Sequence, residues 1–194
     1  MKKNNDWLDH SYDTYNIKSC ITKIKEQFGQ QFSDSQSIRE QHTHTMTIHN
    51  SELPDGVLFA DTKDDVAKAV KICNQYGCPI IPFAVGSSFE GHLNAPFGGL
   101  SIDINNMNKI IEVYHEDLSV VVQPGVTRED LNTHLRDTGL FFPIDPGANA
   151  SLGGMASTRA SGTNAVRYGT MKDNVISIEA VMPNGEIIKT SNRA

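Results

Sequence analysis

PIDPGANASLGGMASTRASGTNAVRYGTMKDN, residues 143–174, is the stretch on which the interpretation of this chain depends most. Five glycines stand in it among small Ala, Ser and Thr residues, and no periodic apolar pattern runs through it. Such a segment has few side chains to pack, but it exposes backbone N–H groups that form concave anion sites. An idle surface loop is the alternative, although ordered loops of this length are usually functional. The stretch therefore predicts a site for a phosphate or pyrophosphate group.

The composition indicates a soluble globular chain of one domain or two small lobes. Its 194 residues include 38% hydrophobic residues and carry a formal net charge of −6. This acidic balance, without a cluster of Lys and Arg, argues against a nucleic-acid partner. No apolar run approaches the roughly 18 residues that span a bilayer. The polar start, MKKNNDWLDH, fits neither a signal nor a transit peptide, so we expect an unprocessed, cytoplasmic protein.

The cysteines and histidines offer no metal motif. Cys20, Cys73 and Cys78 are odd in number and lack metal-ligand spacing, and Cys73 falls on the apolar face of an expected helix. Buried or unreactive thiols are therefore favoured over a disulfide. His42 and His44 would suit a strand-like metal pair, but no Cys or carboxylate ligand stands nearby in a known spacing. A solvated polar loop accounts for them better.

Residues 1–52 form a polar, helical lead-in to the domain that follows. An apolar residue recurs at helical spacing before a glycine, at Ile17, Ile21, Ile24, Phe28 and Gly29. This pattern predicts an amphipathic helix that ends at the glycine, and a second short helix is expected over residues 35–42. No residue of the lead-in suggests a chemical role. We expect it to pack on the outside of the domain.

A βαβ unit is predicted from residue 57 onward. Residues 57–60 and 79–83 are apolar runs of strand length, and the segment between them has a helical apolar face. Thr62 with Asp65 resembles a capping box, and Gly77 ends the helix. A strand, a helix and a strand in this order predict a parallel pair.

The loop AVGSSFEGH, residues 84–92, follows the second of these strands. Open α/β sheets bind ligands at the ends of parallel strands, and the loop presents amides and hydroxyls there. It lacks both the GxGxxG spacing and the Gly-Lys-Ser/Thr of a P-loop. Taken alone it is a weak signal, because a simple strand-to-strand turn explains it about as well.

The remaining chain reads as further scaffold. Strands are predicted over residues 100–104, 110–113 and 119–122. Thr127 and Asp130 open a further helix that ends at Gly139, with Leu131 and Leu135 on one face. Asn184-Gly185 between apolar runs at 175–182 and 186–189 is a strong hairpin signal. The elements together predict an α+β protein.

Three segments in combination resemble a known family. They are PFAVGSSFEGH (82–92), PGVTREDL (124–131) and DPGANASLGGMASTRASGTNAVRYGTMKDNV (145–175). In this order and separation they resemble the FAD-binding domain of the vanillyl-alcohol oxidase/p-cresol methylhydroxylase (PCMH) superfamily, most of all FAD-linked D-lactate dehydrogenases and the glycolate oxidase flavin subunit. The resemblance implies a PCMH-type FAD-binding fold of two small α/β lobes, roughly 53–106 and 107–194, within a domain over 53–194. Because a complete relative would continue past Ala194 into a substrate cap domain, we expect the fold to be incomplete at the C-terminus.

The resemblance also implies which residues hold FAD. The first loop would wrap the pyrophosphate, and a second wall would follow the ribityl chain and flavin, with Tyr168 on the flavin side. Ile176 or its neighbours would lie near the adenine. The implied residues are, in chain order, Val85, Gly86, Ser87, Ser88, Gly91, His92, Pro146, Gly147, Ala150, Ser151, Gly153, Gly154, Ser157, Ser161, Gly162, Tyr168, Gly169 and Ile176. Some relatives attach FAD covalently through a loop histidine, but here the corresponding positions read Gly-Ser-Ser, which predicts non-covalent FAD.

For a full-length relative, the resemblance implies oxidation of a D-2-hydroxy acid, of the D-lactate or glycolate type, by hydride transfer to flavin N5. The electrons would pass to a cytochrome or quinone, and a divalent metal would be bound only in the missing cap region. Such a protein would be cytoplasmic, with association at the inner membrane as one option, or mitochondrial in a eukaryote. Within this chain no catalytic base is identified. A loop-capping role explains His92 better than catalysis does. Arg159 and Arg167 would either bind a substrate carboxylate or be solvated or salt-bridged surface groups, and the second is more usual for a loop arginine.

Two alternatives remain open. The first is a truncated, catalytically idle form of the FAD-binding domain, or a partner subunit, that binds FAD weakly or not at all. The second is part of another enzyme of the same fold, such as alkylglycerone-phosphate synthase or a sugar oxidase. A sheet that lacks later strands would expose an apolar face and an edge, which predicts a complementing chain or an oligomer.

Overall fold

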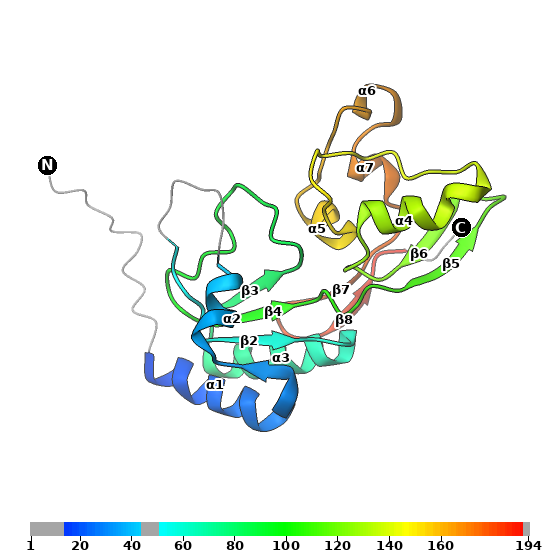
Figure 1. Cartoon of the computed structure of the whole chain (residues 1–194). Helices are drawn as coiled ribbons and strands as arrows, with labels where there is room; N and C mark the ends of the chain where they lie inside the picture. Colours follow the sequence, from blue (N-terminus) through cyan, green and yellow to red (C-terminus); the bar gives the residue numbers. More distant parts are fainter. Residues whose placement is uncertain (1–13, 44–50, 192–194) are drawn as a thin grey trace, which may run out of the picture.

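The computed structural model describes residues 14–43 and 51–191, which form two lobes side by side (Figure 1). One lobe is built on a four-stranded sheet, and the other combines a hairpin with several short helices. Each lobe has a hydrophobic core of its own, so two separate sets of apolar side chains hold the described residues together.

The polar lead-in is part of the first core rather than only a cover for it. Its elements are α1 (Thr14–Phe28), the 3-10 turn η2 (Gly29–Gln31), β1 (Phe32–Ser33) and α2 (Gln36–Gln41). Both predicted helices are confirmed, and Cys20 and Ile24 of α1 are fully buried. Strand β1, which the sequence pattern did not reveal, pairs antiparallel with β2.

His42, directly after α2, is only 4% exposed, so the expectation of a solvated loop is wrong at this position. Its ring packs 4.3 Å from the ring of Phe83 and forms a hydrogen bond to a buried carboxylate, which explains the burial. His44, the other member of the considered pair, lies outside the described residues.

The main sheet has the order β1-β2-β4-β3. Its longer strands are β2 (Gly56–Phe59), β3 (Ile80–Phe83) and β4 (Leu100–Asp103). The three predicted strands are confirmed, but β2 and β3 do not pair with each other, because β4 lies between them and is parallel to both. The predicted parallel pair is therefore corrected to a split unit. All four residues of β4 are buried, as suits the central strand.

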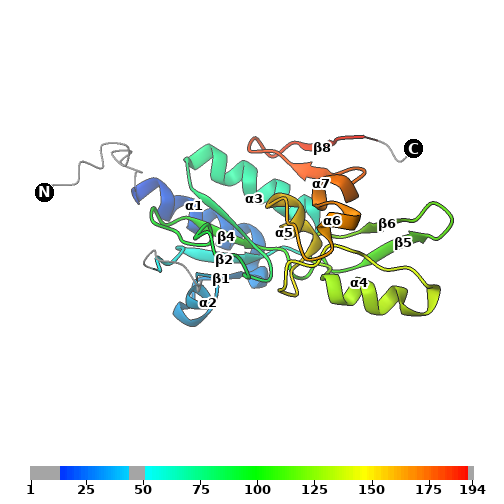
Figure 2. The same cartoon turned by 90° about the horizontal axis from the view of Figure 1, so that it is seen from above.

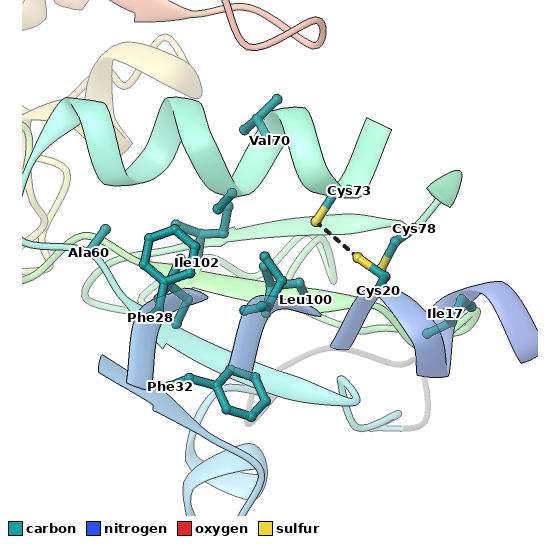
Figure 3. Close-up of a cluster of buried hydrophobic side chains, with 13 residues drawn as sticks. Ile17, Cys20, Phe28, Phe32, Ala60, Val70, Cys73, Cys78, Leu100 and Ile102 are labelled. Carbon is teal, nitrogen blue, oxygen red and sulfur yellow. Dashed lines mark hydrogen bonds between the residues drawn. The ribbon is translucent and has the colours of Figure 1, made fainter. Parts of the chain in front are cut away.

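Helix α3 (Lys63–Tyr76) packs beside α1 over the sheet (Figure 1). The predicted capping box is present: the Asp65 amide donates to Thr62 Oγ1 at 3.1 Å, and the Thr62 amide donates to the Asp65 carboxylate at 3.0 Å. The helix ends at Gly77, as expected. Apolar residues from both helices and the strands meet in the core that Figure 3 shows.

The second lobe begins with an antiparallel hairpin of β5 (Ile110–Tyr114) and β6 (Ser119–Val122), followed by α4 (Arg128–Leu135) and the 3-10 turn η3 (Arg136–Thr138). These strands and the helix match the predicted ones. Thr127 caps α4 by accepting a hydrogen bond from the Asp130 amide at 3.2 Å. Leu131 and Leu135 are buried, so the predicted apolar face of α4 is confirmed.

The glycine-rich stretch contains more regular structure than expected. Three short helices form in it, namely α5 (Leu152–Ser157), α6 (Ala165–Tyr168) and α7 (Met171–Asn174). Two local signals support them: Ser151 caps α5, and Thr170 forms a capping box with Asp173. Leu152, Met155 and Met171 are buried and anchor the stretch to the second core. The absence of a long apolar repeat therefore hid helices of only one or two turns.

The predicted hairpin is confirmed as β7 (Glu179–Val181) and β8 (Ile187–Lys189), although β7 is shorter than expected. It lies beside α3 of the first lobe (Figure 2). Lys63 forms an ion pair with Glu179, and Asn74 Nδ2 donates to the Pro183 carbonyl at 3.1 Å. The last hairpin thus packs against the first lobe, although it follows the second lobe in the sequence.

No helix within the described ranges, 14–43 and 51–191, combines the length and the apolar character that a bilayer-spanning helix requires.

Candidate functional site

The loop after β3 offers a row of unused hydrogen-bond donors. It holds six predicted site residues: Val85, Gly86, Ser87, Ser88, Gly91 and His92. Within the described part of the chain, no backbone amide from residue 85 to 89 donates a hydrogen bond. The local bonds come from the Glu90 amide to Ser88 Oγ at 3.3 Å and from the Asn94 amide to the Gly91 carbonyl at 3.1 Å. Because each backbone N–H group requires a hydrogen-bond acceptor, consecutive free amides can bind an anionic group.

A buried polar network supports this loop from below. Asn105 Nδ2 donates to the Ala84 carbonyl at 3.0 Å, and the Asn105 amide donates to Asp103 Oδ1 at 2.8 Å. The other carboxylate oxygen of Asp103 lies 2.9 Å from His42 Nε2. None of these three side chains was among the predicted site residues. Positions 42 and 103 are far apart in sequence, so no spacing could have indicated the contact.

The two glycine-containing segments rest on a shared support. The turn at Pro124-Gly125 connects them: the Gly125 amide donates to the Met107 carbonyl at 2.8 Å, and the Gly153 amide donates to the Pro124 carbonyl at 2.9 Å. Asn105, which anchors the first loop, belongs to the same turn after β4 as Met107. Figure 1 shows the loop after β3 and helix α5 on the same side of the molecule. The two segments that the sequence predicts as one site are therefore supported by adjacent backbone.

The second segment places its predicted residues in and around α5 and α6. Pro146, Gly147 and Ala150 precede α5; Ser151 caps it; Gly153, Gly154 and Ser157 lie within it; Ser161 and Gly162 follow it; Tyr168 and Gly169 close α6. The amides of Gly153 and Gly154 are already bound, to the Pro124 carbonyl and to Ser151 Oγ. These two amides are therefore not free donors, and the FAD contacts predicted for Gly153 and Gly154 stay predictions.

Two glycines of this segment are required by close packing. A Cβ on Gly153 would lie 2.5 Å from the Pro124 Cβ, and a Cβ on Gly162 would lie 1.8 Å from the Asp145 carbonyl oxygen. Among the amides of this segment that donate no hydrogen bond within the described residues are those of Ala148, Asn149, Ser161 and Gly162. The segment thus keeps a smaller set of free donors than its sequence suggested.

Tyr168 and Ile176 lie at the outer part of this region. The ring of Tyr168 packs edge-on against Phe141, with ring centres 5.5 Å apart. Ile176 is 61% exposed and lines a groove of about 350 Å³, together with Arg159 and residues of α7. No hydrogen bond within the described ranges joins either residue to the loop after β3. Their predicted contacts with the flavin and the adenine remain predictions.

Arg128 is a cationic residue at the second segment that was not predicted as part of the site. Its guanidinium lies 3.8 Å from Asp145 and 3.7 Å from Glu129, both loose ion pairs. Its Nε atom is buried and has no hydrogen-bond partner among the described residues. A buried, unpaired donor is costly unless a ligand satisfies it. Arg128 is thus a further candidate to hold an oxyanion in a chain of net negative charge.

Comparison with protein families shows the class to which this arrangement belongs. Residues 54–191 match the model of the family described as "FAD binding domain". The match includes both glycine-containing segments and most of the described chain. The chain therefore belongs to the FAD-binding domain family, and the resemblance inferred from the three quoted segments is confirmed.

Individual relatives are more specific. The chain is 43% identical over 184 residues to a probable mitochondrial D-lactate dehydrogenase of Danio rerio, covering 94% of this chain and 37% of the relative. It is 49% identical over 142 residues to the mitochondrial D-lactate dehydrogenase [cytochrome] of Arabidopsis thaliana, covering 73% and 25%. It is 33% identical to the glycolate oxidase subunit GlcD of Bacillus subtilis, covering 89% and 38%. The chain thus spans between a quarter and two fifths of the length of these relatives.

Solved structures share the fold. An alkyldihydroxyacetonephosphate synthase superposes with a TM-score of 0.80 at 24% identity, covering 91% of this chain and 35% of that one. A p-cresol methylhydroxylase superposes with a TM-score of 0.75 at 23% identity, covering 93% and 36%. The predicted α+β, PCMH-type FAD-binding fold is therefore confirmed. At these identities the likeness concerns the fold alone.

Proposed function

We propose that this chain binds FAD non-covalently and forms the cofactor-binding part of a flavin-dependent dehydrogenase of D-2-hydroxy acids. The observation that carries the proposal is the run of unpartnered amides from residue 85 to residue 89. A pyrophosphate is a ligand that such a run can bind through its backbone, because every oxygen of the group accepts hydrogen bonds. The family match over residues 54–191 supports FAD as the source of that pyrophosphate.

The described residues fit this cofactor in three respects. The loop after β3 supplies free amides together with the hydroxyls of Ser87 and Ser88. Asn105 holds the start of that loop in place through the Ala84 carbonyl. Arg128 supplies a buried donor that lacks a partner among the described residues. The predicted residues of the second segment, from Pro146 to Gly169, would follow the rest of the cofactor.

The absence of a covalent link is inferred from the chemistry of the first loop. Its residues 85–88 are Val-Gly-Ser-Ser, which contain no nucleophilic imidazole. The one histidine of the loop, His92, is exposed and follows Gly91 at the C-terminal end of the loop. Release of intact FAD by acid from the purified protein would support this mode of binding, whereas flavin that stays on the denatured chain would exclude it.

Bound FAD would supply an acceptor for the hydride that leaves the 2-carbon of the hydroxy acid. The names of the fish and plant relatives support D-lactate as substrate, and the bacterial relative supports glycolate as the alternative. The plant name also supports a cytochrome as electron acceptor and, in a eukaryote, a mitochondrial location. The catalytic base and a divalent metal would come from the cap region of a full-length relative. A complementing chain or an oligomer would cover the exposed Ile187 and Ile188 of β8.

The substrate class is tested by following flavin absorbance without oxygen in the protein that carries this domain. D-lactate should bleach the flavin fastest, glycolate more slowly, and L-lactate hardly at all. Bleaching by none of these acids, with FAD still bound, would contradict the substrate and favour another activity on the same fold. Failure to bind FAD at all would instead favour the alternative of an idle fragment.

A further inference from the structure

Three thiols that are distant in the sequence meet in the core of the first lobe (Figure 3). Cys20 comes from α1, Cys73 from the last part of α3, and Cys78 from the connection to β3. Their exposed fractions are 0%, 0% and 6%. The Sγ atoms of Cys20 and Cys73 lie 3.8 Å apart, and all three sulfur atoms lie within 4.8 Å of one another. The cysteines are free, as predicted, but their convergence was not predicted.

We propose that Cys20, Cys73 and Cys78 form a three-coordinate binding site for one soft, thiophilic monovalent cation, Cu⁺. Thiolates are the ligands that such ions prefer. Three sulfurs around one ion, each at about 2.3 Å from it, stand about 4 Å apart. The Cys20–Cys73 separation of 3.8 Å lies close to this value and no other separation exceeds 4.8 Å, so the ion can enter with small movements of the side chains. Ordinary core cysteines fill space as small apolar groups and need not share one centre.

The number of ligands favours a three-coordinate ion. Among the described residues, the three cysteines are the one group of His, Cys, Asp or Glu side chains close enough together to hold a metal. A structural zinc site almost always has four protein ligands in a tetrahedron. A trio without a fourth partner in the described ranges suits Cu⁺, for which three thiolates in a plane are sufficient. The aliphatic neighbours of the trio, such as Ile17 and Leu100, contribute no further donor.

The site is separate from the flavin site in the fold. Cys78 precedes β3, whereas the loop with the free amides follows it, so the two lie at opposite ends of the same strand. The strand's four residues place about 13 Å between them, at about 3.3 Å per residue. Metal binding therefore does not depend on FAD, and the two proposals can fail independently.

The test is an anaerobic titration of the reduced chain with Cu⁺ in competition with a colorimetric Cu⁺ chelator. One Cu⁺ per chain should bind, and Cys20→Ala, Cys73→Ala and Cys78→Ala should each weaken the binding at least tenfold. Val70→Ala is the matched control, because it trims the same core and keeps all three thiols. X-ray absorption on the unmodified chain should show three sulfur neighbours around the copper, a readout that does not depend on whether the variants fold.

Several results would overturn the proposal. They are stoichiometric binding that survives any one of the three cysteine variants, loss of binding in Val70→Ala to the same extent, and a copper environment with two sulfurs or with nitrogen. Zn²⁺ is titrated in parallel. Tight binding of Zn²⁺ by a chain that leaves Cu⁺ to the chelator would contradict the assigned charge and coordination number.

Discussion

Gly86→Ala tests the loop after β3 at its most constrained position. Gly86 has a φ of +74°, and a Cβ built on it would lie 3.1 Å and 3.2 Å from two ring atoms of Phe83. The left-handed conformation costs an alanine about 1–2 kcal/mol. The Phe83 ring has little room to move away from the new methyl group, because the buried ring of His42 packs against it with ring centres 4.3 Å apart.

This strain should reduce FAD affinity more than stability. The loop has few internal hydrogen bonds, so in the free chain it can relax around the new methyl group. Binding then has to restore the strained conformation, and a cost of about 1–2 kcal/mol corresponds to a roughly 5- to 30-fold higher Kd. The Kd is measured by titrating the purified chain with FAD and following flavin fluorescence. Thermal unfolding of the same samples gives the change in stability.

Gly139→Ala is the matched control. Gly139 has a φ of +76°, but a Cβ added there would have no atom within 4 Å, and this glycine ends the turn after α4, away from the loop. The substitution should lower the melting temperature through the same backbone strain and leave the Kd for FAD unchanged. If Gly86→Ala binds FAD as tightly as Gly139→Ala and the unmodified chain, the role assigned to the loop is refuted.

Three further predictions concern the support of the site and the core. Asn105→Ala should raise the Kd for FAD, because it frees the Ala84 carbonyl that now accepts a 3.0 Å hydrogen bond; the same titration measures this. Ile24→Ala should destabilise the chain by about 2–5 kcal/mol in urea unfolding, since this side chain is fully buried. Asp173→Asn should flatten the acid side of the melting profile. The Thr170 amide lowers the pKa of Asp173 below its ordinary 3.8, so the stability from this cap is present above about pH 4 and is lost as the pH falls.

Each of these has a clear contrary result. An unchanged Kd in Asn105→Ala would mean that the polar network beneath the loop does not position it. A loss below about 1 kcal/mol in Ile24→Ala would place α1 outside the core, as the sequence pattern first suggested. A melting profile of Asp173→Asn that falls as steeply with acid as that of the unmodified chain would remove the proposed role of the cap.

Local signals in the sequence predicted most of the elements. Thr62 with Asp65, Thr127 with Asp130, and Asn184-Gly185 act within a few residues, so their caps and turn are readable from the order of residues alone. The pairing of strands was less accessible. Strand β4 lies between β2 and β3, and its four residues are buried. No local sequence signal distinguishes such a central strand from an edge strand.

The sequence identified the segments that form the site, but not the contacts that their individual residues make. The run after β3 was identified from its glycines and serines, and the structure leaves its amides unpartnered within the described residues. Gly153 and Gly162 looked equally available, yet their lack of a side chain is required by close backbone contacts that only the folded chain reveals. The bond between His42 and Asp103 and the meeting of the three thiols have the same origin. Contacts between distant residues follow from topology, which local patterns do not encode.

The most direct test of the account is a comparison of FAD with FMN and riboflavin in the same fluorescence titration. If amides of the loop after β3 hold a pyrophosphate, FAD should bind at least tenfold more tightly than FMN, which has a single phosphate, and riboflavin should bind most weakly. Acid should then release the bound FAD intact. Equal affinity for the three flavins, or no binding of any of them, would contradict the central claim that this loop is a pyrophosphate cradle.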